Sequence, residues 1–147
     1  MWLGCGLLVR PGGCGRDASA AGSQAVANPE LGITLSEVPE GLVVAVNQGR
    51  ELVLEPSKEG EGGRIRFEVG PETEGVNLVA AVKEHEAGVA AATGGNYLGT
   101  TELMSHLGSA YISRGQFDLD ADPIEEARVF VIHPAGDRLL TLVYSLS

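Results

Sequence analysis

The fold is decided by residues 126–144, which read EARVFVIHPAGDRLLTLVY. Two runs, the apolar Val129–Ile132 and the mostly apolar Leu139–Val143, flank a turn that contains Pro134 and Gly136. Short runs that are apolar at consecutive positions are typical of strands covered on both faces. We therefore predict strands over 126–133 and 138–144 in the centre of an antiparallel sheet.

Upstream of this pair, the sequence mostly alternates between apolar and polar residues, which predicts further strands. Asn47-Gln48-Gly49 lies between two such runs and predicts the turn of a β-hairpin. Residues 97–107 are compatible with a helix, but their alternation favours a strand. The predicted strands are 33–38, 42–46, 51–55, 64–69, 97–107 and 110–113, and the predicted loops are 56–63 and 118–123.

One helix is predicted, over residues 76–92. Its apolar side chains recur at helical spacing, and Gly94-Gly95-Asn96 ends it. Asn77 or Thr73 is expected to cap its first turn. The expected buried face carries Leu78, Val79, Val82 and Val89, and the expected solvent face carries Lys83, Glu84, His85 and Glu86.

These elements predict an α+β fold, in which an antiparallel sheet with an N-terminal β-hairpin is packed by one long helix. We expect one domain over residues 31–147, with an apolar interior that holds no polar cluster.

The charge excludes some classes of partner. The chain of 147 residues has 20 acidic and 10 basic side chains, and its net charge is −10. Nucleic-acid binding depends on clustered Lys and Arg, and here the bases are scattered among acids. We expect no nucleic-acid partner, and no contact with an anionic membrane surface through charge.

The first 30 residues differ from the rest and predict an export segment with a flexible tether. Both cysteines of the chain, Cys5 and Cys14, lie here. Small residues before Cys14 and a tether rich in Ala, Ser and Gly after it resemble a bacterial lipoprotein signal, which implies lipidation of Cys14. The segment departs from that signal, because Pro11 replaces its Leu and Arg10 interrupts the apolar run. A structureless start and a Cys5–Cys14 disulfide remain alternatives.

Residues 31–147 resemble the Mog1/PsbP-like family by pattern. The resemblance rests on the segment GITL (32–35) with Pro39, the hairpin at Gly49, the helix start NLVAAV (77–82), and the two C-terminal strands. It implies an αβα sandwich and a non-enzymatic binding or assembly role. Members of that family commonly carry a helix after the last strand, and this chain ends at Ser147.

No catalytic motif is present in the sequence. His85-Glu86 lacks the second histidine of a zinc-protease helix, and no G-x-S-x-G segment supports a Ser113, His133 and Asp137 triad. A metal site would need His85, His106 and His133 to converge. We expect no catalytic residue, no metal and no cofactor.

The remaining charged candidates are also expected to be structural. Asp118, Asp120 and Asp122, followed by Glu125 and Glu126, begin like a calcium loop but lack its central Gly and its closing Glu. We therefore interpret residues 118–123 as a solvated acidic loop. Arg114 and Arg138 are expected to pair with Glu125, Glu126 or Asp137.

The sequence thus favours a non-enzymatic protein-interaction or assembly module. We expect it to be exported to the cell envelope, periplasm or extracellular space, with another protein as its partner and a lipid anchor at Cys14 as its sole membrane contact. A cytoplasmic location is the alternative. The alternative functions are a small-ligand-binding domain with a pocket between sheet and helix, and a hydrolase around His133. The oligomeric state stays open.

Overall fold

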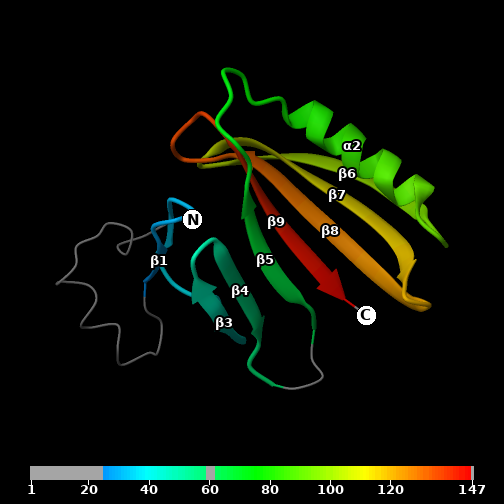
Figure 1. Cartoon of the computed structure of the whole chain (residues 1–147), viewed down its shortest axis with the longest axis horizontal. Coiled ribbons are helices and arrows are strands. Elements are labelled where there is room, and N and C mark those ends of the chain that lie inside the picture. The colour runs from blue at the N-terminus through cyan, green and yellow to red at the C-terminus, as the bar shows by residue number, and fades with distance from the viewer. Residues whose placement is uncertain (1–24, 59–61, 147) are drawn as a thin grey trace. The chain divides into compact units, whose positions relative to one another are not determined.

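The computed structural model describes residues 25–58 and 62–146 (Figure 1). The chain divides after residue 61 into two compact units, which we call the N-terminal and the C-terminal unit.

The N-terminal unit is built from short antiparallel strand pairs. The pair β1–β2 precedes the hairpin β3–β4, whose turn contains Gly49 at a φ of 59°. Only glycine adopts this left-handed conformation without steric cost. The hairpin predicted around Gly49 is therefore confirmed. The strands are β1 (Val26–Asn28), β2 (Ile33–Leu35), β3 (Leu42–Gln48) and β4 (Glu51–Pro56).

The predicted tether ends earlier than expected, because residues 26–28 form β1. The buried side chain of Asn28 explains why this segment is ordered. Its Nδ2 donates to Asn47 Oδ1 at 2.9 Å, and its Oδ1 accepts from the Leu31 backbone N–H at 2.8 Å. Asn47 donates in turn to the Ala27 carbonyl. These bonds hold the short strand although it has little apolar surface to bury.

The C-terminal unit is an antiparallel sheet with a helix across one face (Figure 1). Its strands lie in the order β5-β9-β8-β7-β6. The prediction that the two apolar C-terminal runs lie inside the sheet is confirmed, because β8 and β9 each pair on both edges. The elements are β5 (Arg64–Val69), α2 (Leu78–Ala91), β6 (Asn96–Ser105), β7 (Gly108–Leu119), β8 (Asp122–Ile132) and β9 (Leu139–Leu146).

Helix α2 is capped by Asn77, one of the two predicted caps, and it spans Leu78–Ala91 where 76–92 was predicted. The Asn77 side chain accepts from the Ala80 backbone N–H at 2.9 Å. The buried face differs from the prediction, because it consists of Val82, His85 and Val89, while Val79 is exposed. The placement of His85 on the solvent face was therefore wrong.

Helix and sheet approach closely at Gly115 on β7. A Cβ atom built on Gly115 would lie 2.7 Å from Cγ2 of Val89, closer than carbon atoms pack. The missing side chain makes room for Val89, and this contact fixes the height of α2 above the sheet.

The predicted acidic loop 118–123 is wrong, because most of it belongs to strands. β7 runs to Leu119, β8 starts at Asp122, and Asp120 and Ala121 alone connect them. Both linking residues have positive φ, 52° and 72°. This is the backbone of a tight two-residue hairpin turn, whose twist matches that of the strands. The sequence lacks the Asn-Gly or Asp-Gly pair that usually announces such a turn.

The predicted α+β sandwich is also wrong. About 55% of the described residues lie in strands and 12% in helix, so the fold is β-rich. Long strands account for the difference: β7 and β8 extend through 114–125, which the sequence suggested to be strand ends and loop. Over the described ranges, 25–58 and 62–146, α2 is the one helix.

Candidate functional site

A chain of polar side chains lies buried between α2 and the sheet, where the sequence predicted an apolar interior. At its centre is His85 of α2, of which 8% is exposed. Its Nδ1 is 2.7 Å from Ser113 Oγ on β7, and its Nε2 is 2.9 Å from Glu126 Oε1 on β8. We call the set Thr100, Tyr97, Ser113, His85, Glu126 and Arg128 the buried polar network, after its buried centre of Ser113, His85 and Glu126. Tyr97 and Arg128 are half-buried, and Thr100 is exposed.

The network continues beyond His85 at both ends. On the β6 side, Tyr97 OH lies 2.6 Å from Ser113 Oγ and also bonds Thr100 Oγ1. On the β9 side, Arg128 Nε donates to Glu126 Oε1 at 2.9 Å. The network therefore links α2 to three neighbouring strands.

Strand register brings these residues together. Directly opposed residues of antiparallel strands point to the same face of the sheet. Thr100, Ser113, Arg128 and Val143 form one such row across β6, β7, β8 and β9. Glu126 opposes Gly115, where the missing side chain lets the helix approach.

Glu126 is ionised in the folded chain. Burial raises the pKa of Glu126, but hydrogen bonds from His85 and Arg128, together with the Arg128 charge, outweigh burial and lower it to about 2. A carboxylate only accepts, so His85 Nε2 carries a hydrogen and donates it to Glu126.

The other ring nitrogen, Nδ1, bonds the Ser113 hydroxyl. Ser113 Oγ also bonds Tyr97 OH, which in turn bonds Thr100 Oγ1. Each buried hydroxyl and ring nitrogen has a partner, so the network can remain in the interior without large cost.

The residue types resemble a Ser-His-acid triad, but the geometry does not permit that chemistry. A catalytic serine must reach a substrate carbonyl. Ser113 is 0% exposed, and its oxygen is occupied by both His85 and Tyr97. The arrangement joins helix to sheet and offers no nucleophile to solvent.

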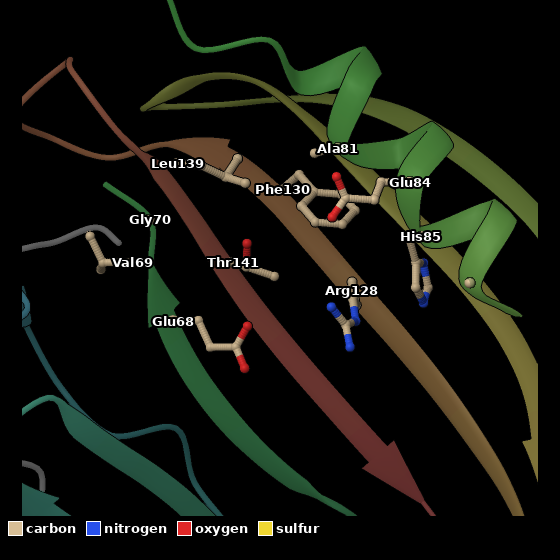
Figure 2. A pocket seen from close by; sticks show the side chains of 11 residues that line it. Glu68, Val69, Gly70, Ala81, Glu84, His85, Arg128, Phe130, Leu139 and Thr141 are labelled. Carbon is tan, nitrogen blue, oxygen red and sulfur yellow. The ribbon is translucent and has the colours of Figure 1, made fainter. Parts of the chain in front are cut away.

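Next to the network lies a cavity of about 360 Å³ between α2 and strands β5, β8 and β9. Figure 2 shows Glu84 and His85 reaching in from the helix, and Arg128, Phe130 and Thr141 rising from the sheet. Its lining mixes charged, hydroxyl and aromatic groups, as ligand sites do.

Another feature of the surface is the outer edge of β6. β6 is the last strand of the sheet and pairs with β7 alone. The strand has ten residues, and a bulge between Tyr97 and Gly99 interrupts its pairing with β7. From Thr100 to Ser105 the pairing is regular. Large apolar side chains are exposed along it: Leu98 and Leu103 at 39% and Met104 at 74%.

The structure does not bring the predicted histidines together in one site. His106 is exposed, whereas His133 is buried and its Nδ1 accepts from the Ala135 backbone N–H. Ser113 bonds His85 and not His133, the histidine considered for a Ser-His-Asp triad, and Asp137 pairs with Arg138. Among residues 25–58 and 62–146, no group of three or more His, Cys, Asp or Glu side chains is arranged to hold a metal ion.

Two predicted ion pairs are confirmed. Arg114 lies 3.2 Å from Glu125, and Arg138 lies 2.8 Å from Asp137, while Arg138 also contacts Glu72. Cys14 lies outside the described residues.

Sequence reasoning missed the buried polar network, although a signal for it was present. His85 follows Val82 by three residues and precedes Val89 by four, which places it on the buried stripe of the helix. Glu126, Arg128 and Phe130 alternate along β8, and so share one face. Together these spacings would have indicated that a buried histidine faces a carboxylate.

Comparisons with known proteins show a fold likeness alone. No family model and no curated protein matches the chain. Among solved structures, the crystal structure of PA94, a protein of unknown function from Pseudomonas aeruginosa, is similar with a TM-score of 0.53 and 12% sequence identity. The match covers 85% of this chain and 83% of PA94.

Within the described part of the chain, no helix has the length and apolar character to cross a membrane.

Proposed function

We propose that this chain is a non-enzymatic protein-interaction module that binds an extended segment of a partner along the free edge of β6. The observation that carries the proposal is the length and exposure of that edge. A strand edge presents unpaired backbone N–H and C=O groups, which a partner strand can satisfy.

Edge strands are normally protected, and β6 carries few of the usual devices. Natural edges are short or carry Lys, Pro or inward-pointing charges. β6 has ten residues, contains neither Lys nor Pro, and has Glu102 as its one charged side chain. Its one bulge lies at the Tyr97 end, which leaves Thr100–Ser105 as a regular template.

The buried polar network supports this function by fixing the strand. Tyr97 and Thr100 belong to β6, and Tyr97 bonds Ser113 inside the layer. One half of β6 is therefore held from within while the other half faces solvent. A rigid template lowers the entropic cost of docking a flexible segment.

The surface indicates the chemistry of the partner. Leu103 and Met104 point to opposite faces of the sheet, so the docked strand would carry apolar residues on both faces. Glu102 and the net charge of −10 favour a partner segment with Lys or Arg.

The test is selection from a library of ten-residue peptides, followed by substitution of the edge. We expect selected binders to combine β-branched residues with Lys or Arg, and Met104→Lys to weaken their binding about tenfold or more. Leu119→Lys is the matched control, because Leu119 is also an exposed apolar residue, at 55%, but lies at the β7–β8 turn. Binders that tolerate Met104→Lys and respond to Leu119→Lys would contradict the proposal.

We further propose that the module is exported and tethered through a lipid on Cys14, as the N-terminal pattern suggests. Mass spectrometry of the chain purified from bacterial membranes should find Cys14 as an acylated N-terminus. A mature chain that still begins at Met1 would contradict the anchor.

A further inference from the structure

We propose that the cavity between α2 and the sheet is a binding site for a small zwitterion, such as an amino acid with a large apolar side chain. This site is distinct from the β6 edge, and the inference does not rest on the proposed function.

The first observation is an unsatisfied hydroxyl on the cavity floor. Thr141 lines the cavity and is 5% exposed. Within the described part of the chain, its hydroxyl has no hydrogen-bond partner. Buried hydroxyls nearly always have one, because leaving one unpaired is costly. A ligand in the cavity would supply the missing partner.

The second observation is a guanidinium that lines the same cavity. Arg128 uses its Nε for Glu126, and its terminal nitrogens make no hydrogen bond within the described residues. The buried polar network fixes its position. Arginine presents paired donors that match a carboxylate. Arg128 and Thr141 together form a donor set for a carboxylate.

The third observation is a carboxylate on the opposite wall. Glu84 extends from α2 into the same cavity, and no ion pair or hydrogen bond neutralises it within the described ranges (Figure 2). Glu68 also lines the cavity, but Arg66 pairs with it at 2.7 Å. Glu84 is therefore the group available to an ammonium.

The combination selects the ligand class. Glu84 would repel a simple anion, and Arg128 would repel a simple cation, so a ligand with both charges fits best. Phe130 and Leu139 also line the cavity, and they favour an apolar side chain. A volume of about 360 Å³ suits a single amino acid or a very small peptide.

The test is calorimetric titration with L-phenylalanine and L-leucine, compared with two probes that each lack one charge. Phenethylamine has no carboxylate, and 3-phenylpropionate has no ammonium. We expect the amino acids to bind about tenfold or more tightly than either probe. Equal binding of all probes, or no binding of either amino acid at 10 mM (about the weakest affinity worth calling a site), would overturn the inference.

Two substitutions distinguish an effect on ligand binding from an effect on folding stability. Thr141→Val removes the hydroxyl with little change in shape, and should weaken amino-acid binding about tenfold without lowering the melting temperature. Glu84→Gln should weaken binding similarly, whereas Glu86→Gln, at an exposed residue of the same helix that does not line the cavity, should not. Unchanged affinity in both Thr141→Val and Glu84→Gln would overturn the proposal.

Discussion

The two halves of β6 meet different environments. Near its start, Tyr97 and Thr100 join a polar network that Ser113 and His85 continue into the interior. Toward its end, Leu103 and Met104 are exposed and their outer edge has no partner strand in the C-terminal unit. The comparison teaches that the first half of β6 is bonded through Tyr97 to buried polar groups of β7 and α2, whereas the second half exposes apolar groups that a partner would cover.

Removing the centre of the network should have the largest effect. His85→Ala takes one partner from Ser113 and one from Glu126 and leaves a void under α2, so we expect a loss of about 3 kcal/mol in unfolding free energy. Urea denaturation measures this loss. His106→Ala, on an exposed histidine, should change the stability by no more than about 0.5 kcal/mol. Equal losses of unfolding free energy in the two variants would show that the network does not stabilise the fold.

The same network predicts a loss of stability in acid. The pKa of Glu126 is lowered from 4.5 to about 2 in the folded chain. A group with a depressed folded pKa stabilises the fold above its unfolded pKa, and this contribution disappears as pH falls from about 4.5 toward 2. Melting temperatures between pH 2 and 7 should converge for the wild type and Glu126→Gln at the acidic end. A constant difference across that range would contradict the assignment.

The close packing of helix on sheet should give an intermediate effect. Gly115→Ala places a Cβ against Val89 and should cost about 2 kcal/mol by overpacking. Gly88→Ala, on the same helix, meets nothing within 4 Å and should stabilise by up to about 1 kcal/mol through helix propensity. Thermal denaturation of both variants checks the sign of each change.

The smallest effect is expected at the β7–β8 turn, which lies at the opposite end of β7 from the residues that pair with Thr101–Ser105. Ala121 adopts a φ of 72°, which disfavours any residue with a Cβ. Ala121→Gly should therefore stabilise by about 1 kcal/mol, and should leave peptide binding at β6 unchanged. Destabilisation by Ala121→Gly would show that the turn has another conformation.

The sequence predicted the positions of the strands and the helix better than it predicted the contacts between their side chains. The hairpin at Gly49, the cap at Asn77 and the central position of the 126–144 strands follow from local patterns, and the structure confirms them. The network was missed because it depends on register, which brings Ser113 opposite Arg128 across 15 residues of chain. The α+β prediction failed because a two-residue turn without glycine is hard to distinguish from a loop.

The most direct measurement is amide hydrogen exchange along β6, with and without a selected basic peptide. In the free chain, we expect outward-facing amides between Thr101 and Ser105 to exchange quickly, while the amide hydrogens of β8, which pairs on both edges, exchange slowly. The peptide should slow the 101–105 amides strongly and leave β8 unchanged. Peptide binding that protects another surface and leaves residues 101–105 in fast exchange would contradict the account.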